Sequence, residues 1–259
     1  MTRDDGGMLV TAVGIFALVV GLTDIINRYL RPSMAKWLVL SGIVLVVLGV
    51  AILLTGWWDR QRASAEGDPH EGHDHGHGRR FSRIGWLLAA PIVFAIVVNP
   101  GALGSYAVGR QTNARDLASL DFDLEEHLRS HTYGGQAAEL NISQVLIAVD
   151  DANQEALLAE TPVRLEGFVV NQDLPADRFL LARILVGCCA GDGTPLAVEM
   201  AGYDGPPLDD DQWVRVTATL DLAATEAKRT AGEKYAEAVF EVENLEKIGV
   251  PTEPYLYPY

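Results

Sequence analysis

Three long apolar runs fill most of the first 110 residues, and shorter segments that alternate between apolar and polar residues follow them. The runs cover about residues 8–27, 37–58 and 84–108, and none carries a charge at its centre. About 20 apolar residues are enough for a helix to cross the hydrocarbon core of a bilayer. Residues 1–110 are therefore predicted to form three transmembrane helices, with interfacial tryptophans near the span ends at Trp37, Trp57, Trp58 and Trp86.

Glycines recur at seven-residue spacing in the first two predicted spans. Gly14 and Gly21 fall on one face of the first span, and Gly42 and Gly49 fall on one face of the second. Small residues let two helix backbones approach closely in a membrane. We expect these faces to pack, either against each other or against a helix of a partner.

The pattern changes after the third apolar run. Residues 111–140 are predicted to form an amphipathic connector, because leucines recur there at helical spacing: Leu117, Leu120, Leu124 and Leu128. Residues 141–250 have the pattern of a small β domain, with strands predicted at 141–149, 161–171, 179–189, 195–200, 213–222 and 238–248 and a short helix at 151–160. This arrangement is similar to that of the five-stranded OB barrel.

The expected fold class is thus a membrane-anchored α + β protein, in which three N-terminal transmembrane helices precede a small OB-like β-barrel domain. The chain ends in a proline- and tyrosine-rich tail, residues 251–259. Proline fixes φ and removes an amide donor, so the tail is predicted to be extended. It is expected either to lie over its own barrel or to dock in a groove of a partner.

Charge divides the chain at the same place as hydropathy. Residues 1–115 contain 11 Lys and Arg against 8 Asp and Glu, whereas residues 116–259 contain 9 against 27. An acidic domain repels phosphate, so no nucleic-acid partner is expected. The first run has neither a basic leader nor a cleavage site, so it should remain as an anchor in the lipid bilayer. The positive-inside rule favours a multi-pass protein of the cell membrane, with the acidic C-terminal domain on the extracytoplasmic side.

A histidine-rich loop, residues 68–78, separates the second and third predicted spans. Four of the six histidines of the chain lie in it, interleaved with carboxylates and glycines: His70, His73, His75 and His77. Imidazole is a common ligand of Zn²⁺ and related transition-metal ions. The loop is therefore predicted to gather a metal ion, Zn²⁺ in particular, and the alternative is a solvated polar linker.

Cys188 and Cys189, the two cysteines of the chain, are adjacent and precede Asp192. Two thiols and a carboxylate could ligate a soft or borderline metal ion, with His127 or His131 brought in from elsewhere. The alternative is that the cysteines are small apolar residues that pack the barrel. A catalytic cysteine is not expected in so acidic a domain, because a reactive thiolate needs an electropositive surround.

Four short segments stand out in the predicted β domain, and the double cysteine followed by an aspartate is the most specific: Glu166–Val169, Phe179–Arg183, Cys188–Asp192 and Trp213–Val214. With the three predicted spans and the histidine-rich loop, they resemble the YcgQ-type family of bacterial membrane proteins, which are described as permease subunits. The family pattern has alanines around the aspartate, where this chain has Gly191 and Gly193. The resemblance implies a partner, a polytopic permease related to arsenite-type carriers, and for some members a link to zinc limitation.

The sequence thus favours a non-enzymatic accessory subunit of a membrane permease that takes part in handling a zinc-like transition metal. Two alternatives stay open, namely a free-standing membrane metal sensor or buffer, and an envelope scaffold or binding module with no metal role. No enzyme is expected, because the sequence shows no nucleophile–base motif, phosphate-binding glycine loop or paired carboxylates.

Overall fold

A computed structural model describes residues 3–65, 94, 101–108, 121–131, 136–171, 174–231 and 238–258. These residues divide into two compact units. One contains residues 1–26 and 32–101, and the other contains residues 27–31 and 102–259. The short segment 27–31, although it lies between two helices of the first unit in sequence, therefore belongs to the second.

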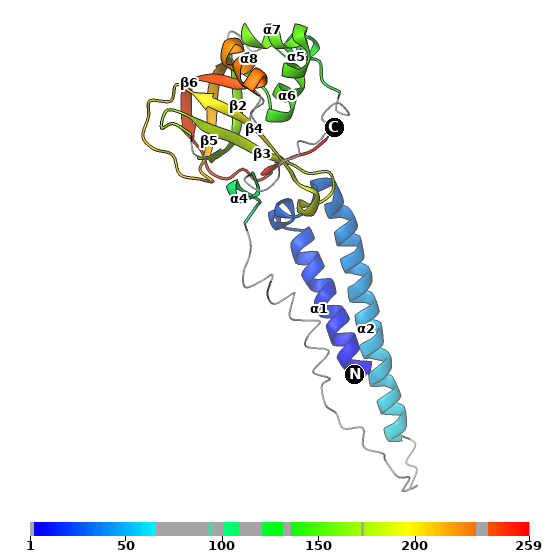
Figure 1. Ribbon diagram of the computed structural model, residues 1–259. Coiled ribbons are helices and arrows are strands. Elements are labelled where there is room, and N and C mark those ends of the chain that lie inside the picture. The colour runs from blue at the N-terminus through cyan, green and yellow to red at the C-terminus, as the bar shows by residue number, and fades with distance from the viewer. Residues whose placement is uncertain are drawn as a thin grey trace. The chain divides into compact units, whose positions relative to one another are not determined.

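The described part of the first unit is an antiparallel pair of helices, α1 (Arg3–Gly21) and α2 (Ala35–Ala65) (Figure 1). The glycine faces predicted from the sequence pack against each other within this pair. A Cβ atom on Gly14 would lie 2.8 Å from the backbone nitrogen of Val46, and one on Gly42 would lie 3.1 Å from the carbonyl oxygen of Gly14. The two backbones approach so closely that these positions admit no larger side chain.

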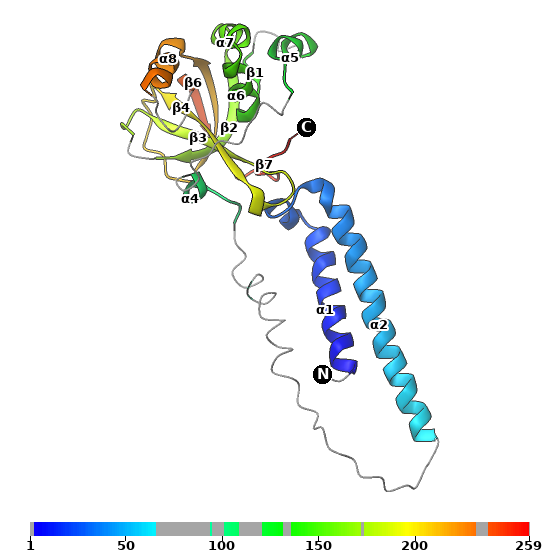
Figure 2. The ribbon, with the colours of Figure 1, turned by 45° about the vertical axis from the view of Figure 1, so that its right-hand side comes forward.

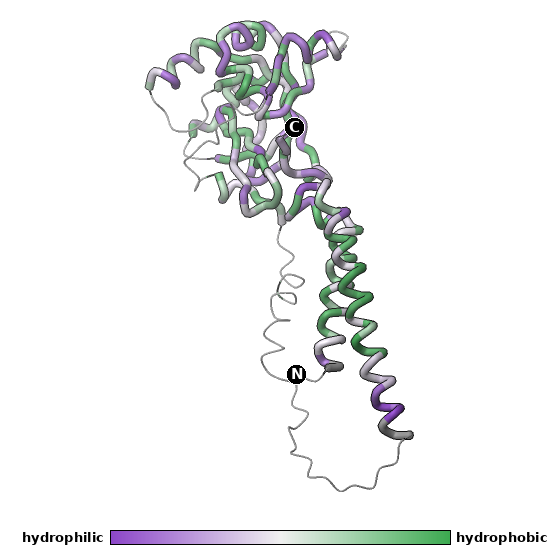
Figure 3. The backbone as a smooth tube through the Cα atoms, turned by 90° about the vertical axis from the view of Figure 1, so that its right-hand side faces the viewer, coloured by the Kyte–Doolittle hydropathy of each residue, from purple (hydrophilic) through white to green (hydrophobic). Residues whose placement is uncertain are grey.

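The outer surface of the helix pair is apolar. Exposed side chains include Val19, Trp37, Val47 and Trp58, and Figure 3 shows hydrophobic residues along most of both helices. Among the described residues, one helical segment, Pro32–Arg62, is long and apolar enough to cross a membrane by length and composition, with a mean hydropathy of 2.9, whereas the apolar helix at Asp5–Gly21 is shorter. Of the three predicted spans, the described residues therefore contain one candidate. The predicted third span, 84–108, falls mostly outside the described residues.

The second unit is built on a five-stranded β-barrel, as the sequence predicted. Its strands are β2 (Val163–Val170), β3 (Phe179–Leu185), β4 (Thr194–Ala201), β5 (Trp213–Leu220) and β6 (Val239–Lys247). The barrel closes in the order β2–β3–β4–β6–β5–β2, with β4 and β6 parallel and the other neighbours antiparallel. Two short strands, β1 (Ala138–Glu139) and β7 (Tyr255–Leu256), add in parallel to β2 and β3.

Short helices cover the barrel. Figures 1 and 2 show four of them gathered at one end, namely α5 (Leu124–Ser130), α6 (Ile142–Asp150), α7 (Ala152–Ala159) and α8 (Leu222–Ala231). We call this the helix end. At the other end lie α4 (Ser105–Val108), the loop 187–193, the segment 27–31 and the tail 251–258, which together we call the tail end.

The predicted strand at 141–149 is wrong, because this segment forms α6. Its start is fixed by a capping box, in which the Asn141 side chain accepts from the Gln144 N–H (3.0 Å) and the Gln144 side chain accepts from the Asn141 N–H (2.9 Å). Reciprocal capping of this kind satisfies amide donors that a helix would otherwise leave free. The buried side of α6 then packs into the main hydrophobic core through Ile142 and Val145.

Candidate functional site

The double-cysteine loop lies at the tail end of the barrel, between β3 and β4. Asp192 fixes its shape, because one carboxylate oxygen accepts from the Gly187 N–H (2.9 Å) and the other accepts from the Cys188 N–H (2.8 Å). Cys188 is exposed and Cys189 is half-buried, and both are free thiols. The structure thus brings all three predicted residues into one turn, with the carboxylate directed at backbone amides.

The segment 27–31 pairs with this loop in the manner of a short β-strand. The Arg31 N–H donates to the Cys188 carbonyl oxygen (3.2 Å), and the Ala190 N–H donates to the Tyr29 carbonyl oxygen (2.8 Å). Leu30 lies opposite Cys189 in an isolated antiparallel bridge. The backbone on both sides of Cys189 is therefore held by a segment more than 150 residues away in sequence.

The described residues of this loop do not by themselves make a complete set of zinc ligands. Hydrogen bonds with Asp192 and with Cys189 raise the pKa of the Cys188 thiol to about 11, so the metal-binding thiolate is scarce at neutral pH. Both oxygens of Asp192 are already engaged with amides. No three His, Cys, Asp or Glu side chains converge as a metal site anywhere in the part of the chain that the structure describes. Metal binding by Cys188, Cys189 and Asp192 stays a prediction.

The predicted histidine ligands do not meet the cysteines. His70, His73, His75 and His77 lie outside the described residues. His127 and His131 lie on and just after α5, at the helix end of the barrel, with their rings stacked 4.4 Å apart. Burial lowers the pKa of His127, against the raising effect of a contact with the Glu139 carbonyl oxygen (3.3 Å), and nearby His131 lowers it further.

A shallow pocket of about 350 Å³ lies beside His127. It is lined by Asp121, Phe122, Asp123, Glu126, His127, Ser130 and Gln144. Asp123 is engaged as the N-cap of α5, where its side chain accepts from the Glu126 N–H (2.9 Å). The pocket therefore contains carboxylates and a titratable imidazole, and one of the carboxylates, Asp123, caps α5.

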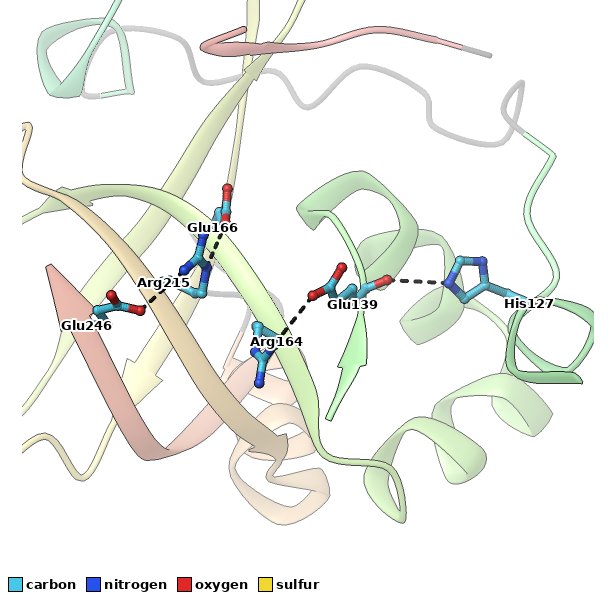
Figure 4. A network of polar contacts seen from close by, with 6 residues as sticks. All are labelled: His127, Glu139, Arg164, Glu166, Arg215 and Glu246. Atoms are coloured by element: carbon cyan, nitrogen blue, oxygen red, sulfur yellow. Dashed lines mark hydrogen bonds and ion pairs between the residues drawn. The ribbon is translucent and has the colours of Figure 1, made fainter. Parts of the chain in front are cut away.

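Two groups of polar contacts lie on the outer surface of the second unit (Figure 4): one joins Glu246, Arg215 and Glu166, and the other joins Arg164, Glu139 and His127. Arg215 contacts Glu166 at 2.7 Å and Glu246 at 3.2 Å, and Arg164 contacts Glu139 at 3.4 Å. The side chains of these ion pairs are a third or more exposed, and exposed ion pairs contribute little to stability. These contacts form a solvated surface, and they offer no enclosed reaction site.

The two ends of the chain match two parts of one family. The DUF1980 N-terminal domain matches residues 8–113, and the DUF1980 C-terminal domain matches residues 146–258. The chain carries both DUF1980 domains. This is in general agreement with the YcgQ-type resemblance, while the membrane and permease roles implied by that resemblance stay proposals.

No curated protein matches the sequence. One solved chain that matches the structure is described as an aspartyl-tRNA synthetase from Leishmania major Friedlin, with 13% sequence identity and a TM-score of 0.24. The match covers 46% of this chain and 22% of that one. A likeness this distant says nothing about the function of the DUF1980 chain.

Sequence reasoning gave no role to three side chains that organise the ends of the barrel. Glu199 and Arg183 each stand alone as a charge within an apolar strand, and that pattern was the available signal for a buried polar role. Both are buried in the structure. Tyr255 lies in the predicted extended tail. Its hydroxyl forms hydrogen bonds with segments far apart in sequence, and such contacts leave no pattern along the chain.

Proposed function

We propose that this protein is a non-enzymatic accessory subunit of a polytopic membrane permease, in which the α1–α2 pair is anchored in the lipid bilayer and the barrel works at its surface. The observation that carries the proposal is the place of residues 27–31. They connect two apolar helices in sequence, yet their backbone is hydrogen-bonded to the loop 187–193 of the barrel. A barrel joined in this way responds to the helix pair, which suits a subunit that couples membrane helices to a surface domain.

The apolar outer face of the helix pair supports both proposed contacts, one with the lipid bilayer and one with the partner protein. Large exposed apolar areas on a protein mark contact with lipid or with another protein. Since the glycine faces are used within the pair, a permease would contact the larger aliphatic residues on the outside, such as Val47 and Leu54.

Connectivity supports a specific topology. Because residues 27–31 and 102–259 form one unit, they would lie on the same side of any membrane that α1 and α2 cross. The chain would then return across the membrane between α2 and Ala102, where the sequence predicts its third span. We place the acidic domain on the extracytoplasmic side of the cell membrane, as the positive-inside rule favours.

The barrel is proposed to be OB-like, because its closure order and its parallel β4–β6 pair suit a five-stranded Greek-key barrel. In OB-folds the face of the second and third barrel strands binds ligands. Here every residue of β3, the second barrel strand, is buried, and β7 of the tail pairs with it. We therefore propose no nucleic-acid partner and no enzymatic activity for this face.

Handling of a transition metal is proposed for the histidine loop, with Zn²⁺ as the leading ion. His70, His73, His75 and His77 supply the ligand chemistry, with Cys188, Cys189 and Asp192 as a second candidate set. Metal content of the purified chain, compared with a variant in which all four are alanine, tests this part. Zinc that stays bound in the variant would contradict it.

Photo-crosslinking in native membranes tests the permease partner. A crosslinking residue placed at Val47, which is 61% exposed, should form an adduct with a polytopic transport protein. The matched control is Val46, whose side chain lies against Gly14 and should crosslink only within the chain. Adducts at residue 47 with lipid alone, in cells that express the chain at its natural level, would contradict the proposal.

A further inference from the structure

The hydroxyl of Tyr255 joins three segments that are far apart in the sequence. It accepts a hydrogen bond from the Leu103 N–H (2.9 Å) and donates one to the Arg28 carbonyl oxygen (2.9 Å). Tyr255 itself is 2% exposed. A buried hydroxyl with both a donor and an acceptor satisfied fixes the positions of the groups around it.

The rest of the tail makes further contacts with residues 27–31. The Asn27 side-chain amide donates to the Thr252 carbonyl oxygen (3.2 Å), and the Arg31 guanidinium donates to the Pro258 carbonyl oxygen (3.0 Å). The Arg31 guanidinium also lies 5.8 Å from the centre of the Tyr257 ring. The tail thus contacts both ends of the segment and, through Tyr255, its middle.

The tail is held to the barrel independently of that segment. β7 pairs with Ile184 and Leu185 of β3, and the Val186 N–H donates to the Leu256 carbonyl oxygen (2.8 Å). The Arg183 guanidinium donates to the carbonyl oxygens of Glu253 (3.1 Å) and Tyr255 (3.3 Å). One side of the tail is therefore attached to β3 and the other to the segment between α1 and α2.

From this arrangement we propose that residues 251–258 form a clasp that holds segment 27–31 against the double-cysteine loop and so controls access to the half-buried Cys189 thiol. The backbone of segment 27–31 pairs with that of the loop on both sides of Cys189, through the Leu30 bridge and the two flanking hydrogen bonds. When the clasp is closed, the segment stays paired with the loop and limits the approach of a reagent to Cys189. When the clasp opens, the segment separates from the loop and Cys189 becomes accessible. This inference goes beyond the proposed function and does not depend on a permease partner or on a bound metal.

Two tyrosine-to-phenylalanine variants test the clasp in the full-length chain, purified in detergent. Tyr255→Phe keeps the ring and removes both hydroxyl hydrogen bonds. Tyr257→Phe is the matched control, because the Tyr257 hydroxyl is buried and has no hydrogen-bond partner among the described residues. Both variants are made in a Cys188→Ser background, so that Cys189 is the single thiol.

Two rates are measured: the labelling of Cys189 by a maleimide and the hydrogen exchange of the Arg31 amide. Neither the Cys189 thiol nor the Arg31 amide contacts the Tyr255 hydroxyl. Loss of one net hydrogen bond corresponds to about a fivefold change in a local opening equilibrium. Tyr255→Phe should therefore raise both rates by about fivefold, whereas Tyr257→Phe removes an unpaired buried hydroxyl and should not raise either of them. The Val216 amide in β5 reports on global unfolding and should exchange at the wild-type rate.

Two results would overturn the clasp. One is faster exchange of the Leu103 amide alone, with Cys189 labelling and Arg31 exchange at wild-type rates. The other is an equal effect of the two tyrosine variants. If Tyr255→Phe fails to fold, Asn27→Ala removes a single contact between the segment and the tail, and it should raise the same two rates by a smaller factor; unchanged rates in that variant would also reject the clasp.

Discussion

The two ends of the barrel differ in whether their buried charged side chains have all their partners. At the helix end, the carboxylate of Glu199 is 1% exposed and contacts two cations, Arg178 (2.6 Å) and Lys228 of α8. At the tail end, Arg183 is also buried, yet its Nε atom has no hydrogen-bond partner among the described residues, and the same holds for the Tyr257 hydroxyl. One end satisfies its buried polar atoms and the other leaves two of them unpaired.

The difference indicates which end is built to change. A buried polar atom without a partner costs free energy, and native structures keep few of them. The tail end accepts that cost where four segments meet: 27–31, 102–108, 187–193 and 251–258. At the helix end, capping hydrogen bonds and the Glu199 ion pairs fix short local helices. We infer that the helix end stabilises the barrel, while the tail end is the part that opens more readily.

The largest effect on stability is expected from Glu199→Gln. The change leaves two cations beside a neutral amide, and breaking a buried ion pair typically costs about 3 kcal/mol of unfolding free energy. Glu246→Gln is the matched control, because its exposed pair with Arg215 is worth about 0.5 kcal/mol. Urea denaturation of the full-length chain, followed by tryptophan fluorescence, measures both. Equal losses in the two variants would remove the distinction between a buried and a solvated pair.

The barrel strands could be predicted from the sequence because their residues alternate over short stretches bounded by turn residues. β2 and β5 begin and end within two residues of their predicted limits. The strand predicted at 141–149 is wrong, since its apolar run, the five residues Val145–Val149, is too short to distinguish a strand from a helix. Asn141 followed by Gln144 was the capping signal that could have decided it. Helix α8 was also missed, although Ala223, Ala224 and Ala227 favour a helix.

The candidate site was only partly predictable. Residue type alone singles out the double cysteine and Asp192. Their chemistry, however, depends on which donors hydrogen-bond to the Asp192 carboxylate, and in the structure these donors are backbone amides. The covering segment 27–31 and the tail lie more than 150 and about 60 residues away in sequence. Contacts at such separation leave no local periodicity, so no pattern in one sequence could reveal them.

The second largest effect is expected at the tail end, from Asp192→Asn in a Cys189→Ser background. Asp192 is the largest cause that raises the pKa of Cys188 and Cys189 is the next, so removing the carboxylate in this background should lower the pKa further towards its ordinary value of 9.0. More thiolate is then present at pH 9, and labelling by iodoacetamide should be about tenfold faster. The control is Asp204→Asn, which changes the net charge equally at an exposed position. A pH profile of labelling that is the same in both variants would show that Asp192 does not govern this thiol.

A third comparison applies one substitution at both ends. Burial lowers the pKa of Arg183 to about 10. Its positive charge therefore destabilises the fold at neutral pH, and this destabilisation is relieved as the pH rises above 10. Arg183→Met removes this buried charge but also its hydrogen bonds to the Glu253 and Tyr255 carbonyl oxygens. Because the two effects oppose each other, the unfolding free energy should change by less than about 1 kcal/mol. Arg178→Met should cost more, because it removes a cation from the buried Glu199. A larger loss at Arg183 would reverse the assignment of the two ends.

The smallest effect tests whether the helix end is insensitive to mild acid. The pKa of His127 lies below 6.5, chiefly because of burial, so protonation of its imidazole opposes folding and stability should fall as the pH drops through that lowered pKa. His127→Gln should remove this component, a change below about 0.5 kcal/mol because solvent screens a partly exposed ring. His131→Gln should reduce it without removing it, since His131 contributes only part of the shift. Denaturation at pH 7 and pH 5 measures both variants, and a larger acid loss in His127→Gln than in the wild type would mean that the imidazole stabilises α5 in its charged form.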